Sequence, residues 1–147
     1  MIFQSDSNQI RWRLHLKSAP ERVYQALSTD AGRASFWAES AIERDGIIHF
    51  VFPNKMTWNA RILGVIPSSQ YTVQYFGNSI TNFLLEEDGR GGTDLTLTDE
   101  GVPAADRAEV IAGWVSVLMA LKATVDFGAD LRTHDAYRQW DTGYVEN

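Results

Sequence analysis

Apolar residues recur at steps of three and four in a long stretch near the end of the chain, at Ile111, Trp114, Leu118, Leu121 and Val125. This spacing forms one stripe of an amphipathic helix, which we expect over residues 103–130. Pro103 suits a first helical turn, where no N–H is needed. At 1.5 Å per residue the helix would be about 40 Å long, too long to be covered by one neighbouring helix. The pattern therefore predicts a single helix lying across a broad sheet.

The segment 10–17 alternates between apolar and polar residues, which is the two-residue period of a half-buried strand. Two short helices are expected after it. Ser18 stands three residues before Glu21, the spacing of a capping box, and Pro20 lies in the first turn. Asp30 is placed to cap the second helix.

Strands and turns are predicted for the next sixty or so residues. Asp45-Gly46 is a strong two-residue hairpin signal, and further turns follow at 67–69, 77–78 and 88–92. The strands expected between these turns cover residues 41–44, 47–52, 56–66, 70–76, 80–87 and 93–98. The whole chain, 1–147, is predicted to be one α+β domain with a seven-stranded antiparallel sheet, a core at 10–130 and a tail at 131–147 that packs on its surface.

Composition is consistent with an ordinary globular domain. The chain has 147 residues, of which 44% are hydrophobic and 12% aromatic, and it contains no cysteine. We see no apolar run long enough to cross a bilayer and no secretory signal in the first nine residues, so we expect a cytoplasmic protein that makes no membrane contact. The net charge of −6 opposes binding to phosphate backbones or anionic lipid, so nucleic acid is not expected as a partner.

Residues that could carry catalysis are sparse. His15 and His49 fall on the polar phase of their strands and His134 lies in the tail, so neither a metal site nor a cofactor is predicted. The carboxylates near turns are expected to be solvated with ordinary pKa values; they are Glu86, Glu87, Asp88, Asp99 and Glu100. Arg61 and Lys122 lie nearest apolar positions and could reach a pocket mouth or form surface ion pairs. No catalytic residue is assigned.

Large side chains at the inward-facing positions of the predicted strands and helix are the most informative group for function. They either fill an ordinary core or form the wall of a ligand cavity, and the sequence does not choose between these. In the second case a tyrosine hydroxyl would orient the ligand. The candidate wall residues are Trp12, Phe36, Trp37, Phe50, Phe52, Trp58, Tyr71, Tyr75, Trp114, Leu118 and Leu121.

These segments resemble a known family in their order and separation. Residues 18–27 followed by Phe36-Trp37, residues 60–67, and Gly113-Trp114 with Leu118, Leu121 and Lys122 are similar to motifs of the family named for the activator of the heat-shock chaperone ATPase. That family lies within the START and birch-pollen-allergen superfamily. The resemblance covers about 10–130, and Phe36 departs from it because a Trp-Trp pair is common there. It implies a helix-grip fold, in which a curved sheet wraps around the long helix.

The resemblance also frames the functional hypotheses, since fold alone does not decide function. The first is a protein that binds a small apolar or amphipathic molecule between the sheet and the helix. The second is an enzyme of the same fold, cyclase-like or hydrolase-like, acting on an aromatic or polyketide-like substrate. A co-chaperone role is placed behind both, because in the proteins for which the family is named this domain is one part of a larger chain. Tail aromatic residues Tyr137, Trp140 and Tyr144 could cover this domain or a second copy in a homodimer.

Overall fold

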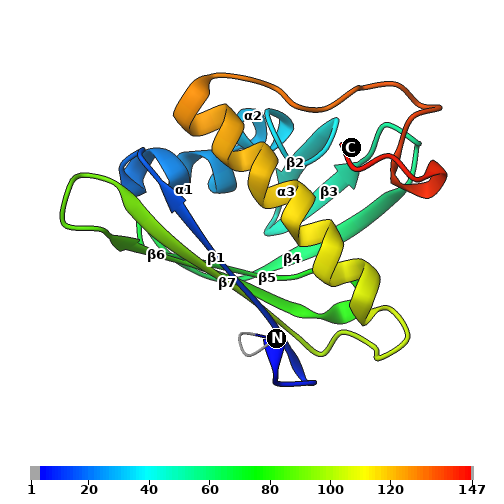
Figure 1. The fold of residues 1–147 in the computed structure, drawn as a ribbon, viewed down its shortest axis with the longest axis horizontal. Helices are drawn as coiled ribbons and strands as arrows, with labels where there is room; N and C mark the ends of the chain where they lie inside the picture. The colour runs from blue at the N-terminus through cyan, green and yellow to red at the C-terminus, as the bar shows by residue number, and fades with distance from the viewer. Residues whose placement is uncertain (1–3, 147) are drawn as a thin grey trace.

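A computed structural model describes residues 4–146 and has the predicted α+β architecture (Figure 1). The seven strands form one antiparallel sheet in the order β1-β7-β6-β5-β4-β3-β2. Their bounds are β1 Gln9–Leu16, β2 Ser40–Arg44, β3 Ile47–Val51, β4 Thr57–Ile66, β5 Gln70–Gln74, β6 Ile80–Glu87 and β7 Thr93–Glu100. The helices are α1 Pro20–Ser28, α2 Asp30–Ala34 and α3 Arg107–Phe127. The helix-grip prediction is confirmed.

Helix α3 lies across the concave face of the curved sheet (Figure 1). Trp114, Leu118, Leu121 and Val125 are buried, as the three-and-four spacing predicts. The predicted bounds 103–130 were too wide. Residues 104–106 form a turn, so Pro103 lies outside the first helical turn, and Gly128 ends the helix in the left-handed conformation at φ 61°.

The predicted capping box at the start of α1 is wrong. Ala19 is the residue before the helix, and no side chain caps it. The Ser18 hydroxyl instead donates 2.8 Å hydrogen bonds to Val125 O and Asp126 Oδ1, and the Asp126 carboxylate accepts from the backbone N–H groups of Lys17 and Ser18. A contact distant in sequence therefore replaces the local one and ties the end of α3 to the start of α1.

Asp30 does not cap α2 either. Thr29 is the N-cap, and its hydroxyl accepts a hydrogen bond from the Gly32 N–H. The Asp30 carboxylate accepts from the Glu43 N–H and from Arg33, whose fully buried guanidinium also donates to Ala41 O. These bonds hold α2 against β2.

The sequence analysis found no apolar run long enough to span a membrane, and for α3 this was wrong. An 18-residue stretch of this 21-residue helix has a mean hydropathy of 1.6, so α3 could cross a bilayer by length and composition alone. In the structure one side of α3 packs on the sheet through Trp114, Leu118 and Leu121. Burial in the core accounts for the apolar character of this side, whereas Val115 and Met119 are exposed.

Residues 131–146 follow the outer side of the domain and are held by polar contacts. The buried Arg132 guanidinium donates to the carbonyl oxygens of Ala34 and Ala38 and pairs with Asp130. His134 places Nδ1 2.5 Å from Glu39 Oε1 and Nε2 2.6 Å from Asp130 Oδ2. Each ring nitrogen therefore faces a carboxylate, an arrangement that favours the imidazolium form.

Replacing Trp114 by alanine should lower the free energy of unfolding by about 3–5 kcal/mol, because a large buried ring leaves a cavity behind. Denaturant unfolding measures this change. Phe127→Ala is the matched control on the same helix, since the Phe127 side chain is 63% exposed, and should cost about 1 kcal/mol or less. Equal losses from the two variants would contradict the placement of α3.

Hydrogen bonds to Asp130 and then Glu39 raise the pKa of His134 above its ordinary value. The stability contributed by this charge is fully present below about pH 6.5 and is lost as the pH rises through the raised pKa. The melting temperature of the wild type relative to His134→Gln should therefore fall between about pH 6 and pH 9. His49→Gln is the control, because His49 bonds the neutral amide of Asn59. A pH-independent difference for His134→Gln would show that the charge is not involved.

Candidate functional site

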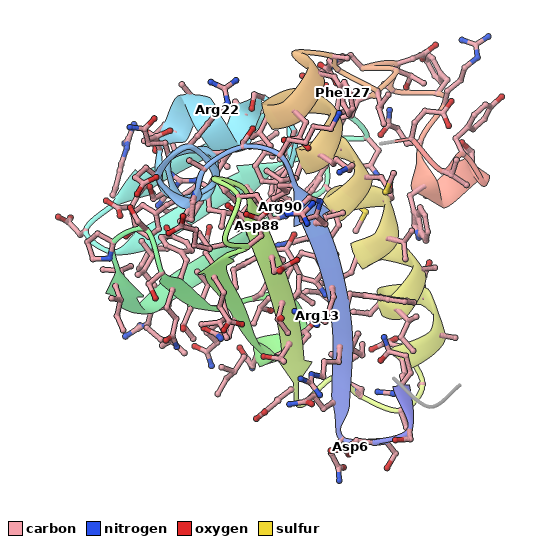
Figure 2. All side chains as sticks on the ribbon, turned by 60° about the vertical axis from the view of Figure 1, so that its left-hand side comes forward. Asp6, Arg13, Arg22, Asp88, Arg90 and Phe127 are labelled. Atoms are coloured by element: carbon pink, nitrogen blue, oxygen red, sulfur yellow. The ribbon has the colours of Figure 1, made fainter. Side chains whose placement is uncertain are left out.

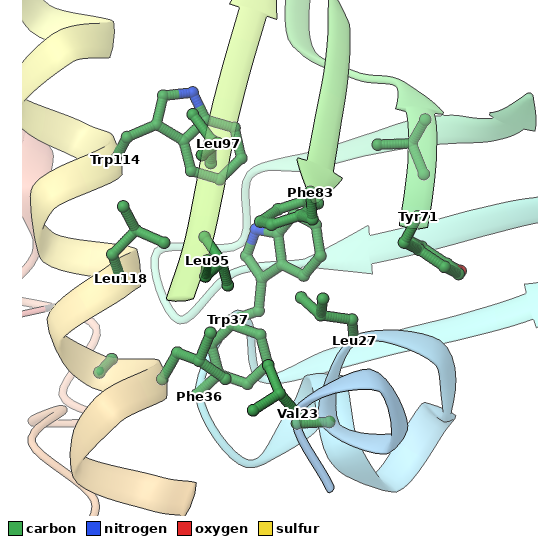
Figure 3. Packing of buried hydrophobic residues seen from close by; sticks show 14 of the residues in the cluster. Val23, Leu27, Phe36, Trp37, Tyr71, Phe83, Leu95, Leu97, Trp114 and Leu118 are labelled. Carbon is green, nitrogen blue, oxygen red and sulfur yellow. The ribbon is translucent and has the colours of Figure 1, made fainter. Parts of the chain in front are cut away.

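The space between the sheet and α3 is occupied by a cluster of aromatic rings, which we call the aromatic chamber (Figure 3). Trp37, which follows α2, lies at its centre. Its ring centroid is 4.9–6.0 Å from those of five others, namely Phe36, Phe50, Tyr75, Phe83 and Trp114. Sequence reasoning chose all of these except Phe83, which falls on the inward phase of β6. Leu118 and Leu121 of α3 complete the wall and are buried.

One end of the aromatic chamber reaches the surface at three rings. Trp58, at the start of β4, lies 4.3 Å from Phe52, 5.1 Å from Phe76 and 5.5 Å from Tyr75, measured between ring centroids. Phe52 and Trp58 are half-buried and Phe76 is exposed. These three rings are where the cluster reaches the surface, between the start of β4 and the turn at Phe76–Asn78.

Two predicted wall residues lie apart from this cluster. Tyr71 is buried and meets Tyr24 of α1 edge to face at 6.0 Å. Trp12 is half-buried on β1, and its indole N–H donates to Ile111 O at 3.1 Å. The structure therefore brings most of the predicted wall together but places these two at its periphery.

Asp99 is the residue that sequence reasoning placed wrongly. It was expected to be solvated at a strand end, but it is 1% exposed and faces the interior. Its two carboxylate oxygens accept hydrogen bonds from Trp114 Nε1 at 2.8 Å and Thr81 Oγ1 at 2.9 Å. Burial raises the pKa of Asp99 above its ordinary value, against the opposing effect of Trp114, Ser79 and Thr81.

A signal for Asp99 was present in the sequence. The alternation Thr93, Leu95, Leu97 puts position 99 on the inward phase of β7. The predicted strand stopped at 98, whereas β7 continues to Glu100. Extending the period by two residues would have identified an inward carboxylate. The buried Arg33 and Arg132 had no comparable signal, because their partners are mostly backbone carbonyls.

Tyr75 supplies a second polar group inside the aromatic chamber. Its hydroxyl accepts a 3.0 Å hydrogen bond from Trp37 Nε1. Burial raises the pKa of Tyr75 well above its ordinary value, the indole N–H groups of Trp37 and Trp58 oppose this, and the nearby Asp99 charge adds to it. Tyr75 is therefore a neutral phenol at physiological pH, and its own proton has no acceptor among the described residues.

Further buried polar atoms lack hydrogen bonds of ordinary geometry. In the part of the chain that the structure describes they are Trp58 Nε1, Tyr71 Oη and Ser79 Oγ. Trp58 Nε1 faces the hydroxyl of Tyr75, and the Ser79 hydroxyl lies beside the Asp99 carboxyl. Burial raises the pKa of Tyr71 to about 12, although the adjacent Arg33 lowers it. The aromatic cluster thus contains polar groups as well as rings, with Tyr75 and Trp58 beside each other and Asp99 beside Ser79.

Two hollows in the structure lie outside the aromatic chamber. One, of about 440 Å³, lies between α3 and the tail. The other, of about 270 Å³, is lined by polar side chains on the outer face of the sheet, among them Asn59, Arg61 and Gln74, and reaches Tyr75. Arg61 therefore lies on the outer face of the sheet, in this second hollow. The Lys122 ammonium donates to His15 O and approaches Asp126.

The histidines have structural partners. His15 Nε2 lies 2.8 Å from Asp88 Oδ2 in the β6–β7 turn, where Asp88 is marked in Figure 2. This contact, with the N–H groups of Arg90 and Gly92, lowers the pKa of Asp88 to about 2, so the expectation of an ordinary value was wrong. His134 contacts Asp130 and Glu39. Within residues 4–146, no group of three or more potential ligands could hold a metal ion.

The curved seven-stranded sheet gripping one long helix places the chain in the START-like class of folds. Residues 17–126 match the family described as Activator of Hsp90 ATPase homolog 1-like protein, and the chain belongs to this family. Comparison with curated protein sequences gave no match.

Solved structures agree with this assignment. A protein from Staphylococcus saprophyticus is 23% identical with a TM-score of 0.73, over 84% of this chain and 96% of the other. The Aha1 dimer from Colwellia psychrerythraea is 25% identical with a TM-score of 0.73, and the match covers 82% of this chain and 97% of the other. A Chromobacterium violaceum protein is 28% identical with a TM-score of 0.65, and the match covers 81% of this chain and 98% of the other.

The buried position of Asp99 predicts an unusual pH dependence. Because its pKa is raised in the folded chain, the folded state holds this proton more tightly, and stability falls as the pH rises from about 3.9 through the raised value. Asp99→Asn cannot ionise. The free energy of unfolding of the wild type relative to this variant should therefore decrease between about pH 3.5 and pH 8, as measured by urea unfolding. A difference that grows with pH would mean that the ionised carboxylate is stabilising.

Proposed function

We propose that this protein binds a small amphipathic molecule in the aromatic chamber, between the sheet and α3. The observation that carries the proposal is the Tyr75 hydroxyl proton, which has no acceptor among the described residues although it lies inside an aromatic lining. A buried polar group without a partner costs about 1–3 kcal/mol. A ligand oxygen or nitrogen between Trp58 and Tyr75 would remove this cost, while the rings would contact an apolar body.

Entry would take place at the mouth formed by Phe52, Trp58 and Phe76. These rings are partly exposed: Phe52 follows β3, Trp58 is at the start of β4, and Phe76 is in the turn between β5 and β6. Gly77, at φ 63°, lies within the turn that carries Phe76, and the sheet has no β5 partner for β4 before Arg61. Rotation of the mouth rings opens the chamber without breaking a strand pair.

An enzyme of the same fold is the second candidate, and Asp99 is the observation in its favour. A buried carboxyl with a raised pKa is a typical general acid or base. However, both of its oxygens already accept hydrogen bonds from Trp114 and Thr81, so it has little capacity left for a substrate. Binding is therefore the better supported function.

Two partner proposals follow from the comparisons. The family description names an ATPase activator, so stimulation of a chaperone ATPase is a proposal, which we place behind ligand binding. The Colwellia psychrerythraea structure is a dimer, which supports a homodimer here as well. We place the protein in the cytoplasm because cysteine is absent from the sequence.

A thermal-shift screen against small amphipathic molecules tests the proposal. We expect one class of compound to raise the melting temperature of the wild type, as binding to the folded state requires. Tyr75→Phe removes only the hydroxyl. It should weaken the binding of that compound about tenfold, which is the scale of one buried hydrogen bond. Tyr137→Phe is the matched control, because Tyr137 is 86% exposed. Stabilisation that is equal in both variants would remove the chamber from consideration.

A further inference from the structure

An apolar hollow lies between α3 and the tail. Figure 1 shows residues 128–146 leaving the end of α3 and returning beside the helix. The space enclosed between them, about 440 Å³, is called the tail hollow here. Its apolar walls are Ala112, Val115 and Met119 of α3 and Leu131, Trp140 and Val145 of the tail. This volume falls within the range of small-molecule sites, about 300–1,000 Å³.

The tail is held beside α3 by polar bonds at its ends rather than by packing into the hollow. Arg132 anchors the near end to the carbonyl oxygens of Ala34 and Ala38. At the far end Trp140 Nε1 donates to Glu109 Oε1 at 3.0 Å, and the Ser116 hydroxyl donates to Val145 O. Between these points the apolar side chains stay open to solvent, with Met119 47% exposed and Val145 70% exposed. The hollow is therefore a fixed slot with an unfilled apolar lining.

One cation and one carboxylate line the tail hollow, Arg132 and Glu146. The Arg132 charge is compensated by Asp130, and Glu109 adds a second carboxylate at the rim through its bond to Trp140. The rim is therefore negative on balance. An occupant with a positive charge would complement this rim, whereas an anionic one would be repelled.

The shape of the slot further restricts the occupant. A flat protein surface cannot enter a space walled by a helix on one side and a chain segment on the other, whereas a narrow apolar chain can. We propose that the tail hollow binds an amphipathic amine, a molecule with an apolar chain or ring and one protonated amino group. The apolar part lies along Val115 and Met119, and the ammonium group faces Glu146. This site differs from the aromatic chamber but adjoins it at Phe36, which belongs to both.

Calorimetric titration with decylamine, decanol and decanoic acid, all below their micelle concentrations, tests this. Decylamine should bind tightest and decanoic acid weakest. Met119→Gln should weaken the binding of decylamine about tenfold, because it removes apolar contact. Glu146→Gln should reduce the preference of the protein for decylamine over decanol about fivefold, because it removes the charge. Phe127→Gln is the matched control, because Phe127 projects from the end of α3 (Figure 2) and should leave binding unchanged.

Other outcomes would overturn the proposal in distinct ways. Loss of decylamine binding in Tyr75→Phe but not in Met119→Gln would place the amine in the aromatic chamber. Binding of decanoic acid as tight as that of decylamine would remove the role of Glu146. Sedimentation that shows a wild-type dimer and a Met119→Gln monomer would make a second copy of the chain the occupant. Failure of the chamber screen leaves the expected results here unchanged.

Discussion

The hydrogen bond from Trp114 Nε1 to the buried Asp99 carboxylate connects the two layers of the domain. It joins the middle of α3 to the end of β7 in a space from which water is excluded. The Trp114 ring, held in this way, packs against Trp37, Tyr75 and Phe83. The same bond places a carboxyl beside the Tyr75 hydroxyl, so one interaction determines both how the helix sits and which polar groups the interior contains. A hydrogen bond in this environment is stronger than the same bond in water, and its loss would leave one oxygen of the buried carboxyl without a partner, since Thr81 bonds only the other.

The fold could be predicted from the sequence because its main signals are periodic. The alternation in β1 and the three-and-four stripe of α3 each repeat over many residues, and burial enforces them. The errors fell where one residue had a choice of partners. Ser18 was expected to cap α1 locally, but the Asp126 carboxylate and Val125 carbonyl compete for it across the domain. Such a choice depends on three-dimensional proximity and leaves no trace in local spacing.

The candidate site was predictable in its apolar part and not in its polar part. Strand alternation identified Phe50 and Trp58 as inward-facing and helical spacing identified Trp114, and most of the predicted rings do meet. Asp99 was missed because a polar residue near Gly101 resembles the start of a turn, although the period of β7 runs through it. Whether aromatic rings fill the interior or surround a cavity depends on their rotamers and on the distances between them. Amino-acid composition gives neither. The predicted ligand wall therefore stays a prediction.

The contacts between α2 and β2 have a consequence for how molecules of this protein meet. β2 is the terminal strand of the sheet, and an exposed terminal strand invites pairing with a strand from another chain. Here the Glu43 N–H and the Ala41 carbonyl are already bound by Asp30 and Arg33. The main-chain groups that a new strand would need are thus occupied by side chains of the same molecule. Continuous sheets across two copies, and the fibrous growth that can follow from them, are blocked at this border unless α2 first comes away.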